Sequence, residues 1–410
     1  MTAFYFVEPI DSLFVRGNLA FGSEGEHGAG VMPPPPSLFA GAFRSAILGQ
    51  NPRALEQFIQ NGRCDDPHLV AALGTPHEPG RFRIRWSSLA VRREGNPPEA
   101  IEPVFPLPAD LVRFDEGFAQ LTPSQPANLN SLVSDNRALP RVAVLHTGKQ
   151  AKPQANVYLN EVGWRKHLSG LLPDDQDCVK PADLYSRDPR LGIGLNADAR
   201  TAESGLIYTT EGYAFSPTAR PDQERPRFTE TGFLVGIDGA DGLLPDTGFL
   251  RLGGDGRGAS YRRVDYRHAV TSLDHAVRSD RFRLILTTPG LFLSQGPQAE
   301  GGRAKSQGWL PAGVALEGKH YLLRREAFSA RLVCASAPRR EVVSGWNLFQ
   351  WRPKDAQCAV PAGAVYWFED FQGDHDKLAE WVANGLWGDD PDTVRRAEGF
   401  NNATLAAWRA

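Results

Sequence analysis

The chain has 410 residues, 41% of them apolar, and this size predicts two domains that each bury a core. Its 45 Lys and Arg residues are balanced by 48 Asp and Glu residues, which excludes the broad basic surface of a free-standing nucleic-acid-binding protein. The four cysteines form no CxxC pair, which indicates reduced thiols in the cytoplasm. From the pattern of the first residues we expect no signal peptide, and no apolar run approaches the roughly 18 residues of a membrane span.

The first half begins with a strand, a glycine loop and a helix. Residues 3–8 predict a short buried strand that ends at Pro9. After a glycine-rich loop, Ser37 is expected to cap a helix whose apolar residues recur at helical spacing until Gly49. Residues 51–185 are rich in proline and hold only short strand candidates, so we interpret them as an insertion in the first domain.

From residue 191 onward the pattern favours strands. Residues 191–214 predict two strands around a polar turn, and residues 231–239 predict a third. Further strands are predicted at residues 281–293, 328–338 and 362–370, and at the end of the chain. Asp374 is expected to cap a helix. Because strands and helices interleave in both halves, we expect an α+β fold of two domains, residues 1–268 and 269–410, rather than a Rossmann or barrel fold.

The densest functional signal is the segment from Arg251 to Ser260. Two arginines, Arg251 and Arg257, accompany four glycines: Gly253, Gly254, Gly256 and Gly258. Glycines let the backbone approach a ligand closely and offer N–H groups to phosphate. Three interpretations stay open: a cradle for RNA backbone, a plain flexible loop, and a nucleotide-cofactor loop. The cofactor loop lacks the amphipathic helix that must follow it in a Rossmann unit.

Single arginines and aromatic residues elsewhere are weaker candidates for RNA contacts. Arg16 lies between the first strand and the glycine loop, and Arg44 lies on the first helix. Either one is equally compatible with a structural role. Trp309, Trp346 and Tyr261 lie beside Gly or Arg and are candidates for base stacking, although core packing accounts for most tryptophans.

Motifs for chemistry are mostly absent from the sequence. It contains no HExxH, EF-hand or GxSxG pattern. Two aspartate clusters are expected to cap helices rather than bind metal: Asp174, Asp175 and Asp177, and Asp389, Asp390 and Asp392. We therefore expect neither a metal nor another cofactor. His27 is a candidate general base for RNA cleavage, but no second acid or base stands beside it.

Several segments, taken in order, resemble the RAMP proteins of CRISPR type III-B (Cmr) complexes. They run from one end of the chain to the other, so the resemblance covers all of it. The segments are EPIDSLFVRGNLAFG…PPPPSLFAGAFRSAIL, RLGIGLNADARTAESGLIYTTEGYAF, GFLRLGGDGRGASYRRV, LTTPGLFL…GWLP, SGWNLFQWRPK…VPAGAVYWFED and GFNNATLAAW.

The resemblance implies two ferredoxin-like (RRM-like) domains and a non-catalytic subunit of a ribonucleoprotein in antiviral defence. Such a subunit binds the 5′ repeat-derived handle of the crRNA and bridges the large polymerase-like subunit to the adjacent backbone RAMP subunit. It meets target RNA indirectly and touches no membrane. The RNA-binding residues expected on this basis are Arg16, Gly22, Gly25, Gly28, Gly30, Arg44, Arg251, Gly253, Gly254, Gly256, Arg257 and Gly258. Ser37 and Trp309 complete the set of expected RNA-binding residues, without a match to the family's motif positions.

Two other functions stay open. One is a RAMP endoribonuclease that processes precursor crRNA with His27 as its base. The other is an assembly subunit that contacts protein only. The related Csm complex is a further possibility for the assembly to which the chain belongs.

Overall fold

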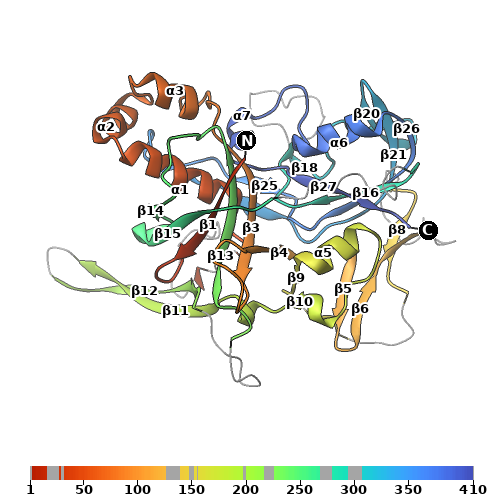
Figure 1. Cartoon of the computed structure of the whole chain (residues 1–410), viewed down its shortest axis with the longest axis horizontal. Helices are drawn as coiled ribbons and strands as arrows, with labels where there is room; N and C mark the ends of the chain where they lie inside the picture. The colour runs from red at the N-terminus through yellow and green to blue at the C-terminus, as the bar shows by residue number, and fades with distance from the viewer. Residues whose placement is uncertain are drawn as a thin grey trace. The chain divides into compact units, whose positions relative to one another are not determined.

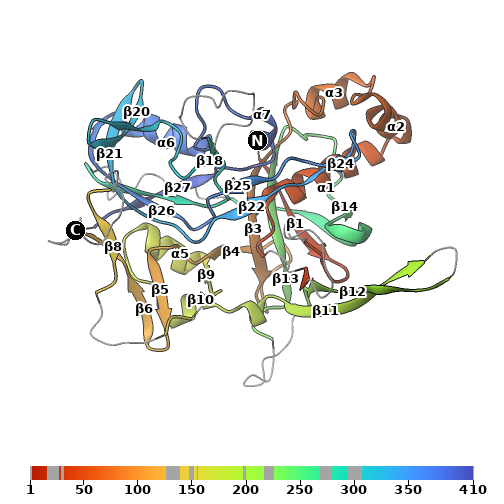
Figure 2. The same cartoon turned by 180° about the vertical axis from the view of Figure 1, so that it is seen from behind.

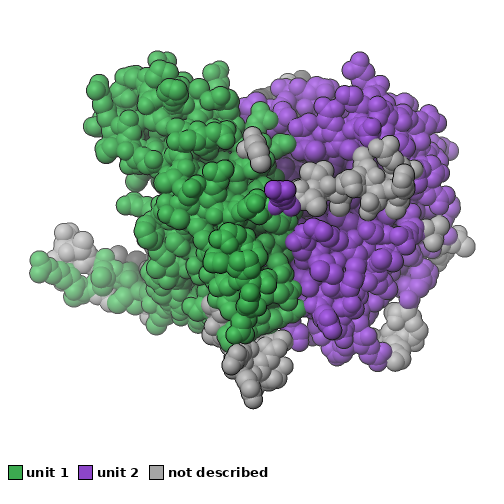
Figure 3. Space-filling view, viewed as in Figure 1, with its two compact units in different colours: residues 1–103, 181–266, 342–356 green, residues 104–180, 267–341, 357–410 purple. Residues whose placement is uncertain are grey.

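A computed structural model describes most of the chain. The residues of the chain form two compact units (Figure 3). Unit 1 comprises residues 1–103, 181–266 and 342–356, and unit 2 comprises residues 104–180, 267–341 and 357–410. The expected boundary between residues 268 and 269 stays a prediction. The described residues are 2–15, 27–28, 32–125, 139–146, 152–154, 156–196, 200–216, 226–267, 279–293 and 307–409.

Unit 1 is built on an antiparallel sheet with the strand order β3-β13-β1-β15-β14 (Figure 1). Two of these strands, β1 and β13, were expected from the sequence, and those expectations are confirmed. The strands are β1 (Ala3–Pro9), β3 (Arg83–Arg92), β13 (Glu230–Asp238), β14 (Thr247–Arg251) and β15 (Gly258–Val264). Strand β3 lies within the proline-rich stretch 51–185 and pairs along its length with β13.

Helix α1 (Pro36–Gly49) packs on the sheet of unit 1 through aromatic residues. The ring of Phe39 lies 5.1 Å from that of Phe233, and the ring of Phe43 lies 5.5 Å from that of Tyr5. The helix begins at Pro36, so the expectation that Ser37 caps it is wrong. Proline has a fixed φ and no N–H, both of which suit the first turn of a helix.

A long β-ribbon also belongs to unit 1. It pairs β11 (Ser186–Asn196) with β12 (Thr201–Ala214), as the sequence predicts, and β2 (His27–Gly28) lies parallel to β12. The ribbon projects from the rest of its unit in both views (Figures 1 and 2). Three exposed apolar side chains occupy alternate positions on it: Leu191, Ile193 and Leu195.

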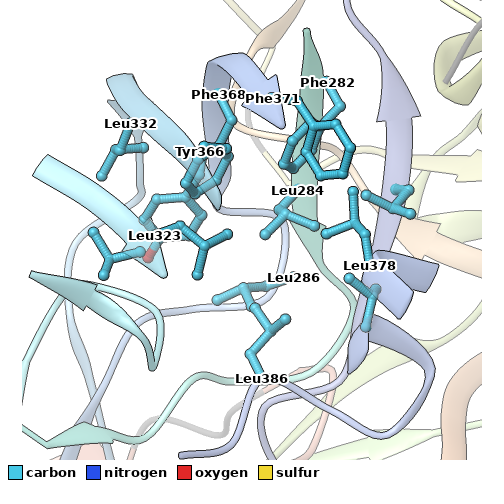
Figure 4. Packing of buried hydrophobic residues seen from close by; sticks show 14 of the residues in the cluster. Phe282, Leu284, Leu286, Leu323, Leu332, Tyr366, Phe368, Phe371, Leu378 and Leu386 are labelled. Atoms are coloured by element: carbon cyan, nitrogen blue, oxygen red, sulfur yellow. The ribbon is translucent and has the colours of Figure 1, made fainter. Parts of the chain in front are cut away.

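Unit 2 contains an antiparallel sheet with the order β19-β20-β21-β26-β16-β27. Helix α6 (His375–Ala383) covers part of it, and Asp374 caps the helix as expected. Leu284, Tyr366 and Leu378 belong to one buried cluster beneath them (Figure 4). The strands are β16 (Phe282–Leu286), β19 (Val314–Glu317), β20 (His320–Arg325), β21 (Phe328–Ser336), β26 (Val365–Gly373) and β27 (Ala403–Ala407).

The remaining elements are short. The other helices and helical turns are α2 (Pro52–Asn61), α3 (Pro67–Leu73), α5 (Glu161–Leu168), α7 (Thr393–Ala397), η1 (Asp175–Asp177), η2 (Pro181–Asp183) and η3 (Gly254–Gly256). The other strands are β4 (Glu102–Pro106), β5 (Leu111–Phe114), β6 (Gly117–Gln120), β7 (Thr122–Ser124), β8 (Val142–Val144), β9 (Tyr158–Asn160), β10 (Cys178–Val179), β17 (Phe292–Leu293), β18 (Gln307–Gly308), β22 (Glu341–Val343), β23 (Trp346–Asn347), β24 (Arg352–Pro353) and β25 (Gln357–Ala359). Asp174 caps η1 and Asp392 caps α7, so both aspartate clusters contain the expected cap.

The protein is therefore a strand-rich mixture of helices and antiparallel sheets. This confirms the α+β expectation at that level, and it differs from a Rossmann fold, whose strands are parallel. Within the described ranges, no helix is both long and apolar enough to cross a membrane.

Candidate nucleic-acid interface

The loop between β14 and β15 holds the glycines and arginines that the sequence singles out, and we call residues 251–258 the arginine loop. Arg251 and Gly258 lie opposite each other at its base, and η3 forms its tip. The Arg251 side chain is exposed and forms no ion pair with any residue that the structure describes. Its guanidinium group is therefore available to an external anion.

The four glycines of the arginine loop differ in what they do. Gly253 has φ 82°, and a Cβ there would lie 2.5 Å from the carbonyl oxygen of Phe14. The N–H of Gly254 donates to that same oxygen at 2.8 Å. By contrast, a Cβ at Gly256 would meet nothing within 4 Å, and Gly258 is exposed. The first two glycines thus serve packing inside the protein, and the open side of the loop lies at Gly256.

Beside the loop lies a group of charged side chains that we call the arginine–aspartate cluster: Asp11, Ser12, Asp188, Arg190 and Arg257. Asp11 pairs with Arg257 and lies 3.4 Å from Nη2 of Arg190. Arg190 in turn pairs with Asp188 at 2.8 Å. Both guanidinium groups also lie over the ring of Phe14, at 5.3 and 5.4 Å from its centroid.

The charges of this cluster hold one another in the ionised state. The backbone N–H of Ser12 donates to Asp11 at 2.7 Å and, together with Arg257 and Arg190, lowers the pKa of Asp11. The hydroxyl of Ser12 donates to Asp188 and, with Arg190, lowers the pKa of Asp188. The cluster therefore presents two fixed guanidinium groups whose charge is largely balanced by two carboxylates.

The other sequence-predicted residues that the structure describes have neighbours of their own outside the arginine loop. Arg44 lies on α1 with its guanidinium group 5.4 Å from the ring centroid of Phe82, a buried side chain. Ser37 lies in the first turn of α1, and Gly28 pairs with Thr210 of β12. Four predicted residues lie outside the described residues: Arg16, Gly22, Gly25 and Gly30.

The three aromatic candidates for base stacking differ in exposure. Tyr261 is buried, and its ring lies 5.7 Å from that of Tyr5. Trp309 is partly buried and packs on the core of unit 2, where its carbonyl oxygen accepts a hydrogen bond from Tyr366 at 2.7 Å. Trp346 is exposed and lies against a second exposed tryptophan, Trp351.

Comparison with known proteins decides the family. The family described as CRISPR-associated protein (Cas_Cmr3) matches residues 5–408, which is nearly the whole chain. The chain belongs to the Cmr3 family. This confirms the resemblance to Cmr-type RAMP proteins. A search of curated protein sequences gave no match.

Among solved structures, this Cmr3-family chain is similar to a chain in a cryo-EM structure of the Type III-B Cmr-beta bound to cognate target RNA. That chain shares 14% identity and a TM-score of 0.46, and the match covers 98% of this chain and 96% of that one. A second such structure, which also contains AMPPnP, gives 13% identity, a TM-score of 0.48 and coverage of 98% and 99%.

Two features of the Cmr3-family chain bear on chemistry. His27, the candidate base, lies in β2, where it is the register partner of Thr209 in the parallel pairing with β12. In the part of the chain that the structure describes, no group of three or more His, Cys, Asp or Glu residues is placed to hold a metal ion.

Sequence reasoning missed Asp11, Ser12, Asp188 and Arg190. These residues come from two segments separated by about 180 positions, and only the tertiary fold brings them to Arg257. The available signal was the segment EPIDSLF in the family resemblance, which contains Asp11 and Ser12.

Proposed function

We propose that this Cmr3-family chain is a non-catalytic subunit of a type III-B Cmr complex that binds the 5′ repeat-derived handle of crRNA. In this role it bridges the large polymerase-like subunit to the adjacent backbone RAMP subunit, in the cytoplasm, in antiviral defence. The observation that carries the proposal is the arginine loop: Arg251 is exposed without an ion-pair partner among the described residues, beside backbone that is open at Gly256.

The arginine loop suits a ribose–phosphate chain for physical reasons. A guanidinium group donates two parallel hydrogen bonds to one phosphate, and these charge-assisted bonds are stronger than neutral ones. Open backbone at Gly256 lets the RNA approach without a side chain in the way. The small net charge of the chain, −3, fits a local groove that other subunits complete.

We further propose that both domains, residues 1–268 and 269–410, are variants of the ferredoxin-like fold, with β3 as a strand of the first domain and not part of the insertion expected at 51–185. In that fold, a β-α-β-β-α-β chain gives an antiparallel sheet with the first and third strands in the centre. The order β3-β13-β1-β15 in unit 1, with α1 between β1 and β3, supports this. The order β21-β26-β16-β27 in unit 2, with α6 between β26 and β27, supports it as well.

The bridging role is supported by exposed apolar surface. Leu191, Ile193 and Leu195 project from the β11–β12 ribbon, and such a patch on an extended element is typical of a surface that another molecule covers.

The test is to replace Arg251 and Arg257 with Ala in the assembled complex and to measure crRNA retention as the salt concentration rises. Each lost phosphate contact should reduce the salt dependence of log K by about 0.7. The affinity itself should fall by about 10- to 100-fold per arginine. The control is Arg263→Ala, because Arg263 is an exposed arginine of β15 that pairs with Asp246 at 3.4 Å. If the double variant retains crRNA as the control does, the arginine loop is not the handle site.

A further inference from the structure

A second candidate surface in unit 1 lies far along the chain from the arginine loop. Strands β23 and β24 form a short hairpin, and we call residues 344–354 the tryptophan hairpin. Trp346 is 52% exposed and Trp351 is 70% exposed. Their ring centroids lie 5.7 Å apart at an angle of 84°, so the edge of one indole meets the face of the other. Two large apolar side chains are thus presented together to solvent, where the hydrophobic effect opposes them.

The hairpin is held by its own hydrogen bonds. At its base, the N–H of Lys354 donates to the carbonyl of Gly345 at 2.9 Å, and the hydroxyl of Ser344 donates to the carbonyl of Lys354 at 2.6 Å. At its turn, Oδ1 of Asn347 accepts from the N–H of Gln350 at 3.1 Å. The two indoles are therefore placed by a built turn and not by a free chain end.

The hairpin combines an anchored residue with a strained one. Phe349, between the tryptophans in the sequence, lies against Gly62, since a Cβ there would be 3.5 Å from its ring. Trp351 has φ 50°, in the left-handed region that a bulky side chain rarely adopts. Backbone strain of this kind is concentrated at sites of function.

The charge beside the indoles favours an RNA occupant over a protein one. Arg352 follows Trp351 directly, its side chain is exposed, and its Nε donates to Gln350 at 3.0 Å. No carboxylate among the described residues forms an ion pair with it. Exposed aromatic rings next to an unneutralised guanidinium group are the combination that stacks nucleobases and holds the adjoining phosphate.

We propose that Trp346 and Trp351 form a stacking platform for unpaired RNA bases, with Arg352 pairing with the phosphate of a stacked nucleotide. The bases must be unpaired, because a duplex covers the faces on which an indole stacks. The proposal rests on the RNA-binding function proposed above, but it uses none of the residues of the arginine loop. It assigns RNA contact to Trp351, which the sequence alone did not single out.

The platform is tested by crosslinking in the assembled complex. In one arm the crRNA carries 5-iodouridine, and in the other arm the target RNA carries it; irradiation then joins the modified base to an aromatic side chain that stacks on it. The expected result is a crosslinked peptide that contains Trp346 or Trp351 in one of the two arms, and that arm identifies the RNA. The proposal is overturned if neither arm crosslinks the hairpin, or if a protein crosslinker joins the hairpin to another subunit while both RNA arms stay negative.

Variants of the same complex supply the affinity. Replacing both tryptophans with Ala should weaken binding of the crosslinked RNA by about 5- to 150-fold for each base stacked. Replacing both with Phe should restore most of that loss, because phenylalanine keeps a stacking face. The control is Leu316→Ala, which shortens an exposed apolar side chain of β19 and should leave binding unchanged. Equal losses in the Ala and Phe variants would overturn the platform.

The two RNA proposals fail separately. If the arginine-loop variant binds RNA normally and the Ala variant of the hairpin does not, the platform stands and the handle site is misplaced. If the arginine-loop variant loses RNA and the hairpin variant does not, the platform is overturned.

Discussion

Replacing Arg283 with Met should destabilise unit 2 more than any exposed substitution. Arg283 lies on β16 and is 1% exposed, and its guanidinium group pairs with Asp110, which is fully buried. It also donates to the carbonyl of Ala407 at 2.9 Å and to that of His167 at 2.8 Å. One side chain thus joins β16, β27, the C-terminal end of α5 and the segment before β5.

The magnitude follows from what the substitution leaves behind. Burial alone would raise the pKa of Asp110, but His167 and Arg283 lower it below its usual value, so the carboxylate is charged. Without Arg283, that charge stays buried and loses its permanent counter-ion. Breaking a buried pair in this way costs about 3–5 kcal/mol. This is a large share of the roughly 5–15 kcal/mol that stabilises a domain.

The assay is hydrogen exchange of the β16 and β27 amides, because a chain with two units need not unfold in one step. The matched control is Arg324→Met, which breaks an exposed pair with Glu317 on neighbouring strands of the same unit and should cost at most about 1 kcal/mol. The double change Arg283→Met with Asp110→Leu should recover much of the loss. If the β16 amides exchange as slowly in the Arg283→Met variant as in the Arg324→Met variant, the buried pair does not hold the unit together.

Three further results are expected. Asp11→Asn removes the anion that Arg190 and Arg257 share, so crRNA should be retained to higher salt, whereas Asp246→Asn should change nothing; equal retention by both variants would contradict this. Burial raises the pKa of Glu341 to about 7, so the stability this group contributes is complete below its unfolded value near 4.5 and is lost as the pH rises through about 7. Glu341→Gln should therefore be more stable than the parent by roughly 1–3 kcal/mol at about pH 8, measured as a higher melting temperature, and this gap should shrink toward about pH 5; a constant gap would refute this. Replacing Leu191 and Ile193 with Ser should lower the yield of assembled complex without changing the melting temperature of the chain, and a matched fall in both would indicate a fold defect instead.

Local patterns in the sequence predicted much of the secondary structure. The strand at residues 3–8, the paired strands of residues 191–214 and the cap at Asp374 all depend on neighbours in the chain, and the structure confirms them. The start of α1 was placed wrongly because Ser37 is a good cap in isolation. The signal that decides the start is Pro36, whose backbone suits the first helical turn.

The candidate site was less predictable, because exposure and charge pairing depend on the tertiary fold. Arg251 and Arg257 look alike in the sequence, yet the structure pairs Arg257 with Asp11 and leaves Arg251 exposed. Trp309 and Trp346 look alike as well, yet one packs on a core and the other faces solvent. No local pattern distinguishes the members of either pair.

The central claim, that the arginine loop holds the crRNA handle, is tested most directly by placing a photoreactive nucleotide in the handle of crRNA within the assembled complex. The crosslinked peptides of this chain are then identified by mass spectrometry. We predict that residues 251–258 are crosslinked, and that the crosslink is lost when Arg251 and Arg257 are replaced with Ala. A handle that crosslinks only to other subunits would contradict the account.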